Sequence, residues 1–458
     1  MGGVINIESD GRLCGARFYS QSTRKGNARE YNCMRCSLFR VAHDFTHYLP
    51  NTARYEGRKE GRRKMVGNSL WRRLGSPRRV AAPMVDASDL AFRTLCREHG
   101  CELAFTPMLN ARLMVSEPAY SRRTFDPGGI ADRPLVTQLA GHDPDHLAAA
   151  ARLCSDDSDA IDLNLGCPQE IAEAGNYGAF LLENTPELAL ECVRALCQRT
   201  ERPVSVKMRL QTTHARTIEM ALKLQDAGVS ALTVHGRSRL QTRRQLGIGA
   251  ADWDTIRDVV AALAVPVIAN GGVATSRCAA SLLEHTGASA VMVGEALLEN
   301  PALFSSNRRP DGSYVDQDAL AARYLELCVM YPPRRGIGHV KEHCRRMLHA
   351  AWAHWPDLAD ELYISADLAA IESVVRRLAA RGWDQPRFHM EDEQPGLSWY
   401  RRRRSSEDDN HDGQEPRQSR SPRKRDVEHA AWVERYLAKS AAKRHGAARK
   451  RLSRSYYI

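Results

Sequence analysis

Eight short apolar segments recur along the middle of this 458-residue chain, and they constrain its fold more than any other feature. They are RRVAAPMV (78–85), CELAFTPML (101–109), PLVTQLAG (134–141), AIDLNLGC (160–167), PVSVKMRL (203–210), ALTVHGRS (231–238), PVIANGGV (266–273) and AVMVGEAL (290–297). Each is short, partly β-branched and nearly continuous in apolarity, which is typical of parallel strands that are covered on both faces. The sequence therefore predicts eight buried parallel strands.

Predicted helices fill most of the gaps between these segments. Ser88 and Thr217 each precede an apolar stretch with helical spacing, and Asp143 and Thr185 each stand directly before a proline at a first helical position. Eight strands that alternate with helices predict an α/β fold, a (β/α)8 or TIM barrel, over residues 75–305. A doubly wound open sheet is the alternative, but such a sheet rarely continues the alternation to eight strands.

Polar or backbone-exposing residues stand at the carboxyl end of nearly every predicted strand. They are Pro83–Met84, Thr106–Pro107, Gln138, Asn164–Cys167, Lys207–Arg209, His235–Arg237, Asn270–Gly272 and Gly294–Glu295. The carboxyl ends of the strands meet at one mouth of such a barrel, where its chemistry is located. We therefore expect these residues to converge on a single site.

The same residues suit a phosphorylated, planar cofactor. Glycines after the last two predicted strands allow backbone N–H groups to approach a phosphate. Lys207 offers a cation to an electron-rich ring, Gln138 an amide to a ring edge, and His235 a further donor. Pro83 and Met84 supply a backbone turn and an apolar wall. No G-x-G-x-x-G turn follows a strand, so the sequence favours FMN over a dinucleotide.

Cys167 lies between a glycine and a proline in IDLNLGCPQEIAEAGNYGAFLL (161–182), at the end of a predicted strand. A thiol titrates within reach of neutral pH, so it can act as a proton donor beside a reduced flavin. A small buried apolar side chain is the alternative role. No second thiol stands nearby to form a redox pair, and no acyl-transfer motif marks Cys167 as a nucleophile.

Residues 318–382 have apolar positions at helical spacing, which predicts a small all-helical domain after the barrel. Five cations gather near its centre, namely Arg334, Arg335, Lys341, Arg345 and Arg346. A solvated helix face would have the same composition. We expect instead that this face contacts phosphates.

Both ends of the chain are basic. The net charge is +11, and residues 1–75 hold 15 Lys or Arg against 6 Asp or Glu, while residues 401–458 hold 17 against 8. This pattern suggests a polyanionic partner, although it also serves solubility alone. We predict a disordered basic extension over 1–74, a charged linker over 383–426 and a basic amphipathic tail over 427–458.

Several classes of protein are disfavoured. No run of about 18 apolar residues predicts a membrane span, and the first residues lack the apolar core of a signal peptide. The 12 cysteines are scattered, as is usual for the reduced thiols of an intracellular protein. Cys33, Cys36, His43 and His47 resemble a zinc set, but the gap between the cysteines and histidines is shorter than in the common finger. We predict no metal.

Six of these segments together resemble the tRNA-dihydrouridine synthases. They are APMV (82–85), QLAG (138–141), DLNLGCPQ (162–169), VKMR (206–209), TVHGR (233–237) and ANGG (269–272). The form NLGCPQEIAEAGNYGAFLL is most similar to the eukaryotic branch that acts on tRNA D-loop positions 16 and 17. The resemblance covers about residues 75–350.

This resemblance implies that NADPH or NADH reduces FMN, that hydride passes to C6 of a uridine, and that Cys167 protonates C5. It implies that FMN contacts Pro83, Met84, Val85, Gln138, Lys207, His235, Asn270, Gly271, Gly272, Gly294 and Glu295. It further implies that the tRNA, with its target base flipped out, contacts Asn164, Arg237, Arg334, Arg335, Lys341, Arg345 and Arg346. Many members have Gly-Arg where this chain has Gly294–Glu295, so a bound phosphate is expected to rely more on backbone donors here. We expect a monomer without a protein partner, in the cytoplasm, the nucleus or both.

Two other functions remain open at this point. Another FMN barrel, of the dihydroorotate dehydrogenase type, would share the cofactor residues but would not need the basic helical region. An RNA-binding protein with a catalytically idle barrel would share the basic regions but would hold no flavin.

Overall fold

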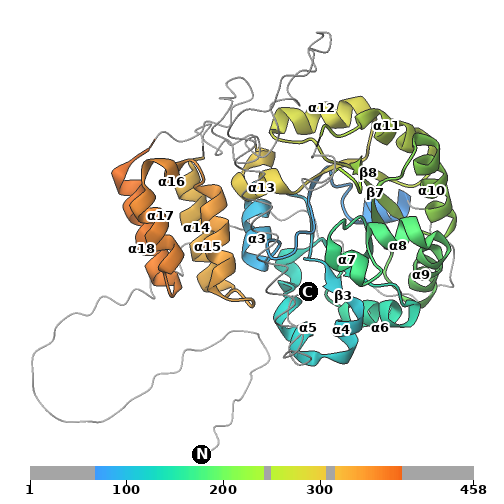
Figure 1. The fold of residues 1–458 in the computed structure, drawn as a ribbon, viewed down its shortest axis with the longest axis horizontal. Helices are drawn as coiled ribbons and strands as arrows, with labels where there is room; N and C mark the ends of the chain where they lie inside the picture. The colour runs from blue at the N-terminus through green and yellow to red at the C-terminus, as the bar shows by residue number, and fades with distance from the viewer. Residues whose placement is uncertain (1–67, 242–248, 306–314, 384–458) are drawn as a thin grey trace, which may run out of the picture. The chain divides into compact units, whose positions relative to one another are not determined.

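The computed structural model describes residues 68–241, 249–305 and 315–383, and within them eight parallel strands form a closed ring (Figure 1). The ring consists of β1 (Arg79–Ala81), β2 (Leu103–Phe105), β4 (Leu135–Ala140), β5 (Ala160–Leu165), β6 (Val204–Leu210), β7 (Ala231–Ser238), β8 (Val267–Asn270) and β9 (Ala290–Val293). Neighbours in the ring follow chain order, and β1 pairs with β9 to close it. A further two-residue strand, β3 (Leu109–Asn110), pairs with β4. The predicted eight-stranded barrel is therefore confirmed.

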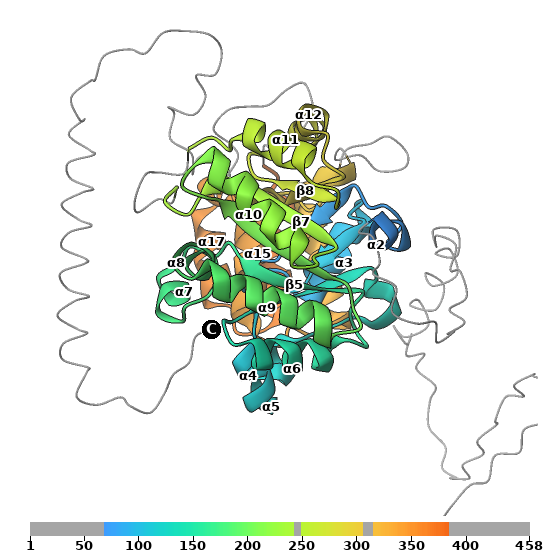
Figure 2. The same cartoon turned by 90° about the vertical axis from the view of Figure 1, so that its right-hand side faces the viewer.

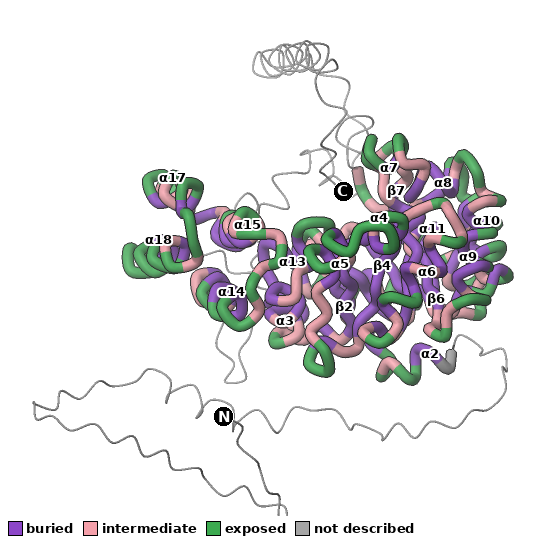
Figure 3. Tube along the Cα trace, turned by 90° about the horizontal axis from the view of Figure 1, so that it is seen from below, coloured by how far each residue is buried: buried purple, intermediate pink, exposed green. Residues whose placement is uncertain are grey.

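Helices cover the outside of the ring, as Figure 2 shows for α9, α10 and α11. In chain order these helices are α3 (Leu90–Glu98), α4 (Ala111–Ser116), α5 (Pro118–Thr124), η3 (Gly129–Asp132), α6 (Pro144–Cys154), α7 (Glu170–Ala174), α8 (Ala179–Asn184), α9 (Pro186–Arg199), α10 (His214–Asp226), α11 (Trp253–Ala262), α12 (Ser276–Thr286), α13 (Glu295–Glu299) and η4 (Leu303–Ser305). Strand residues and inward helix faces are buried in Figure 3. The near-continuous apolarity of the strands is explained by this double covering.

One helix lies where the sequence predicted the end of a disordered extension. Helix α2 (Asn68–Arg73) precedes the first strand, and its Trp71 is only 7% exposed. Trp71 packs with Val80, Leu103 and Met292 in a cluster that contains no residue of the outer helices. The prediction failed here because a six-residue helix is too short to show apolar periodicity.

Helix starts were predicted with mixed success. The carboxylate of Asp143 accepts the N–H of His146 and caps α6 as expected. Asp89 rather than Ser88 caps α3, and Thr213 rather than Thr217 caps α10. Thr185 precedes α9, but its side chain makes no capping hydrogen bond there.

The segment after the barrel is helical, as predicted. It consists of α14 (Gln317–Met330), α15 (Ile337–Met347), α16 (Ala351–His354), α17 (Pro356–Ile364) and α18 (Leu368–Arg381). Helix α14 packs on α3 and α15 packs on α13. Figure 1 shows α14 and α15 on the barrel side of α17 and α18. His343 of α15 is 2% exposed, stacks on Phe92 at 4.6 Å between ring centroids, and its Nε2 lies 2.9 Å from Oδ2 of Asp89. A buried polar contact thus anchors the helical segment beside the first loop at the barrel mouth.

Within the described ranges, no helix is long and apolar enough to cross a membrane, and no group of three or more His, Cys, Asp or Glu is arranged to hold a metal ion. Cys33, Cys36, His43 and His47 lie outside those ranges, as do residues 384–426 of the predicted linker and the predicted tail over 427–458.

Candidate active site

The strand register brings most of the predicted site residues to one level of the barrel. Four pairs of neighbouring positions are Gln138 with Asp162, Asn164 with Lys207, Arg209 with His235, and His235 with Asn270. These positions lie at or near the carboxyl ends of β4, β5, β6, β7 and β8. The expected convergence on the barrel mouth is therefore present on this side of the ring.

Asp162 is a buried carboxylate at the base of this site. Its Oδ1 accepts a hydrogen bond from Oγ of Ser205 at 2.6 Å, and its Oδ2 accepts one from Nε2 of Gln138 at 2.8 Å. Burial raises the pKa of Asp162 to about 6, although Ser205, Gln138 and nearby Lys207 oppose that shift. Asp162 is therefore mainly ionised at neutral pH, and it orients the amide of Gln138.

Asn164 links that buried pair to the loop that carries Cys167. Its Nδ2 donates to Oε1 of Gln138 at 2.9 Å, and its Oδ1 accepts the backbone N–H groups of Gly166 at 3.1 Å and Cys167 at 2.9 Å. The sequence predicts that both amides, of Gln138 and Asn164, contact ligands. The structure shows that each also has a structural role, while the NH2 group of Asn164 keeps one hydrogen for a ligand.

The Cys167 side chain is partly exposed, and its Sγ lies 4.0 Å from Oε1 of Gln169. Burial raises the pKa of the thiol, whereas the backbone N–H of Gln169 and the cations Arg209 and Lys207 act to lower it. Because the net shift is upward from an ordinary thiol value, the group is protonated at neutral pH. Cys167 is therefore able to give a proton away.

Two residues brace the Cys167 loop: Arg209, which the sequence placed at the mouth without a specific role, and Gly178, to which it gave none. Arg209 donates from Nε to the carbonyl of Gly166 at 3.0 Å and from Nη1 to the carbonyl of Ser238 at 3.0 Å. Gly178 has φ +67°, and a Cβ built there would lie 2.8 Å from the carbonyl oxygen of Cys167. Only glycine allows this approach, so the glycine spacing after the cysteine was the available signal.

The positive charge of Lys207 is only partly balanced by negative charge in the protein. Burial, and then repulsion from Arg209, lowers its pKa to about 8, while attraction from Asp162 opposes the shift. The pKa of Arg209 is likewise lowered to about 10, by burial and then by Arg237. An anionic group at the mouth would relieve this repulsion.

The ends of β7 and β8 pack tightly. Gly271 and Gly272 have φ values of +104° and +82°, and a Cβ on Gly271 would lie 2.5 Å from Cδ2 of His235. Trp253 donates from Nε1 to the carbonyl of Gly271 at 3.1 Å, and Asn270 donates from Nδ2 to the carbonyl of Met292 at 2.8 Å. The glycines are thus required by His235 and Trp253, and Asn270 bonds its neighbouring strand.

The loops after β9 and β1 meet at the same mouth. A Cβ on Gly294 would lie 3.5 Å from Sδ of Met84. The hydroxyl of Ser88 donates to the carbonyl of Ala82 at 2.9 Å and accepts the N–H of Met84 at 2.9 Å, which fixes the turn around Pro83. Val85 is 41% exposed, and Glu295, also exposed, lies close enough to Arg209 to oppose part of the lowering of its pKa.

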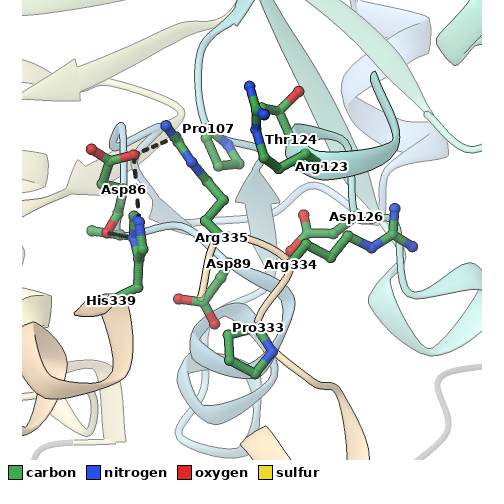
Figure 4. A pocket seen from close by; sticks show the side chains of 11 residues that line it. Asp86, Asp89, Pro107, Arg123, Thr124, Asp126, Pro333, Arg334, Arg335 and His339 are labelled. Atoms are coloured by element: carbon green, nitrogen blue, oxygen red, sulfur yellow. Dashed lines mark hydrogen bonds and ion pairs between the residues drawn. The ribbon is translucent and has the colours of Figure 1, made fainter. Parts of the chain in front are cut away.

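The predicted tRNA contacts are distributed differently. Arg237 is 5% exposed and donates from Nε to the carbonyl of Gly249 at 2.9 Å, so it lies inside the mouth rather than on the surface. Arg334 donates to the carbonyl of Phe125, and Arg335 pairs with Asp86. Both arginines line a pocket between the loop after β1, helix α5 and the start of α15 (Figure 4).

The remaining three cations lie on α15. Nζ of Lys341 donates to the carbonyl of Tyr363 at 2.7 Å, while Arg345 and Arg346 both pair with Glu342. Burial acts to raise the pKa of Glu342, but the attraction of these two arginines outweighs it and lowers that pKa to about 2. One carboxylate therefore offsets part of the basic face that the sequence predicted.

The donor set suits the FMN that the sequence predicts. Lys207 and Arg209 provide positive charge that the protein leaves largely unmatched, and His235 lies beside them in the register. Backbone near Gly271 and Gly272, after β8, is held in a glycine-only conformation, and the Met84 turn is fixed after β1, two strands further along the ring. An anionic, planar molecule at this mouth would meet cations, an imidazole and an apolar wall.

The sequence of this chain is similar to those of several known proteins. The sequence model of the dihydrouridine synthase (Dus) family matches residues 79–354. A tRNA-dihydrouridine(16/17) synthase of Saccharomyces cerevisiae is 37% identical over 270 residues, which is 58% of this chain and 63% of the yeast protein. A similarly named protein of Rattus norvegicus is 37% identical over 322 residues, covering 69% of this chain and 70% of that one. A tRNA-dihydrouridine(20a/20b) synthase-like protein of Mus musculus is 40% identical over 232 residues, covering 50% of this chain and 69% of that one. The chain thus spans less than two thirds of the yeast protein's length.

Replacing Gly178 by alanine tests whether the glycine is needed to seat Cys167. We expect Gly178→Ala to destabilise the protein by more than the roughly 1 kcal/mol typical of alanine at positive φ. The added methyl would meet the Cys167 carbonyl oxygen, so the rate of Cys167 alkylation should change as well. Both quantities are measurable by urea unfolding and by peptide mass spectrometry after iodoacetamide treatment.

Gly129→Ala is the matched control, because Gly129 has φ +63° with nothing within 4 Å of a built Cβ. It should show the backbone strain alone. Equal destabilisation by the two variants, with unchanged Cys167 alkylation in both, would contradict the proposed packing.

Proposed function

We infer, because the chain belongs to the dihydrouridine synthase (Dus) family, that it is a flavin-dependent tRNA-dihydrouridine synthase. The reaction reduces the C5–C6 bond of a uridine in tRNA. The observation that carries this proposal is a protonated Cys167 thiol, fixed through Asn164 at the same barrel mouth as Lys207 and His235.

The residues at the mouth would hold FMN. When bound, FMN supplies the hydride for C6, with NADPH or NADH as its reductant. In this proposal Lys207 places its charge beside the anionic cofactor, and His235 adds a ring nitrogen. The other contacts are Pro83, Met84, Val85, Gln138, Asn270, Gly271, Gly272, Gly294 and Glu295. Gln138 would contact FMN through the amide hydrogen and the lone pair that its hydrogen bonds to Asp162 and Asn164 leave unused.

Cys167 is the proton donor in this proposal. Its S–H bond breaks as a C–H bond forms at C5 of the uracil, and the electron pair of the S–H bond stays on sulfur. A partly buried thiol with a raised pKa holds its proton until a carbanion-like carbon is presented to it. The fixed backbone of Cys167 supplies the orientation that such a transfer requires.

A uridine must leave its stack to reach the barrel mouth, because the site lies at the end of a closed ring. The free amide hydrogen of Asn164 would orient the base there, and Arg237 would act from within the mouth. Arg334, Arg335, Lys341, Arg345 and Arg346 would contact phosphates of the tRNA. Their present partners are surface carboxylates and carbonyls, which phosphates are able to replace.

The finer details of this proposal concern position, assembly and location. We place the modified uridines at positions 16 and 17 of the D-loop, because the names of the yeast and rat relatives give these positions. The chain would work as a monomer without a protein partner. Its location would be the cytoplasm, the nucleus or both.

Cys167→Ala tests the chemical role. We expect turnover on whole tRNA to fall by about 100-fold or more, since general acid catalysis contributes about 10²–10⁴. FMN content and tRNA affinity should be unchanged, because the thiol holds neither. Dihydrouridine is measured by mass spectrometry of digested tRNA after incubation with NADPH.

Cys197→Ala serves as the control, since Cys197 lies on α9 outside the barrel and should be neutral. Undiminished turnover in Cys167→Ala would remove the proton-donor role. Activity of the unchanged protein on free pyrimidines but not on tRNA would indicate another pyrimidine dehydrogenase. Failure to bind FMN after reconstitution would indicate an idle barrel.

The double variant Lys341→Ala/Arg345→Ala tests the RNA contact. We expect weaker tRNA binding and a salt dependence that is shallower by about 1.5–2 in the slope of log K against log salt, as two lost phosphate contacts predict. Arg376→Ala/Arg377→Ala removes the same charge from α18 and should leave the slope unchanged. Identical slopes for the two double variants would contradict a specific contact by α15.

A further inference from the structure

The hydroxyl of Tyr177 is a buried polar group to which the proposed function gives no role. The Tyr177 side chain is 2% exposed, and among the residues the structure describes its hydroxyl has no hydrogen-bond partner. Buried polar groups are nearly always bonded, and one without a partner costs about 1–3 kcal/mol. Phenylalanine would fill the same space without that cost, so the hydroxyl calls for an explanation.

The Tyr177 ring is held so that its hydroxyl cannot turn to solvent. Its backbone N–H donates to the carbonyl of Ala172 at 2.9 Å. A Cβ built on Gly175 would lie only 2.7 Å from Cε1 of the ring, which shows how closely the ring packs on that backbone. Asn176 takes the left-handed conformation, with φ +48°, that makes this turn. The chain therefore uses a strained turn to place this side chain.

Cys167 is the reactive neighbour of that ring. Tyr177 belongs to an apolar cluster with Met108, Ala140 and Phe180, and the Cys167 side chain packs against the cluster. Gly178, which follows Tyr177, lies against the Cys167 backbone. Burial, and then the proximity of Cys167 and of Tyr120, raises the pKa of Tyr177 to about 12. The phenol thus keeps its proton at any physiological pH and is available as a donor.

We propose that Tyr177 is a positioning residue that donates a hydrogen bond to the Cys167 sulfur once that sulfur has lost its proton. The proposal rests on the proposed function, in which proton transfer to C5 leaves a thiolate. The proposal requires a change of χ1 rotamer at Cys167 that brings the sulfur, now 4.0 Å from Oε1 of Gln169, to the phenol. The hydroxyl gains its partner only in that state, which accounts for its lack of one when the thiol is intact.

Other groups also act on the sulfur, and the test must hold them constant. Lys207 and Arg209 face it from β6, and the backbone N–H of Gln169 faces it from its own loop. Both cations favour the thiolate whether or not Tyr177 has a hydroxyl. A variant that removes one oxygen atom from Tyr177 leaves these three groups in place.

The experiment compares Tyr177→Phe with the unchanged full-length chain. The rate of Cys167 alkylation by iodoacetamide is followed against pH, with the Cys167 peptide resolved by mass spectrometry. Loss of a hydrogen bond to a charged sulfur should move the midpoint upward, so that the rate below the midpoint falls about ten-fold or more. Tyr363→Phe, an exposed tyrosine, should leave the profile unchanged. A Tyr177→Phe profile that coincides with that of the unchanged protein would overturn the proposal.

A second variant keeps the proposal testable if Tyr177→Phe does not fold. Incorporation of 3-fluorotyrosine at position 177 retains the hydroxyl and makes it a stronger donor, so the midpoint should move downward. No movement with this variant would also overturn the proposal. Alkylation needs neither tRNA nor reductant, so its outcome is separate from dihydrouridine formation. A Tyr177-dependent profile in a protein that fails to reduce tRNA uridines would refute the proposed function and leave the thiolate contact standing.

Discussion

The arrangement of the barrel mouth depends on the hydrogen bonds that the Asn164 carboxamide makes. Its oxygen accepts two backbone N–H groups of the Cys167 loop, so its nitrogen is left to donate, and Gln138 accepts that bond. Gln138 must then present its own nitrogen to Asp162, which as a carboxylate only accepts. Each bond fixes the direction of the next. Because this series of hydrogen bonds is buried, breaking one of them would leave unpaired polar groups, at a cost of about 1–3 kcal/mol each. The barrel interior thereby fixes the backbone of a residue in a surface loop.

The electrostatics of the mouth follow from the same strands. Arg209 lowers the pKa of Lys207, which extends from the same strand β6, and Arg237 in turn lowers the pKa of Arg209. Buried Asp162 offsets only part of the charge on Lys207. Such an imbalance is unfavourable in the empty protein, and an anionic cofactor would relieve it. The Cys167 thiol next to these cations is still protonated at neutral pH, because its burial outweighs their attraction. A site that attracts an anion and also keeps an acid protonated is what reduction of a pyrimidine ring requires.

The sequence predicts the strands well and the hydrogen-bond partners poorly, for a physical reason. Strands covered on both faces must be apolar throughout, so their positions are visible in the chain itself. Residues at their ends must meet once the ring closes, which is why Cys167 and Lys207 were identified. Hydrogen-bond and ion-pair partners depend on distances between side chains, which are set only when the ring has folded. The bond of Gln138 to Asp162, the burial of Arg237 and the pairing of Arg345 with Glu342 therefore were not predicted. The packing of Trp71 against the barrel strands was missed because its helix is so short.

Hydrogen exchange at the Cys167 amide measures directly whether buried side chains inside the barrel hold the Cys167 loop. The comparison is between the unchanged protein and Gln138→Leu, which removes the bonds to Asn164 and Asp162 while keeping the side-chain volume similar. Thr137→Val, on the same strand, breaks a buried hydroxyl pair with Ser158 and serves as the control. We expect the Cys167 amide to exchange about ten-fold faster or more in Gln138→Leu, with little change at that amide in Thr137→Val. Exchange in folded Gln138→Leu at the rate of the unchanged protein would contradict it.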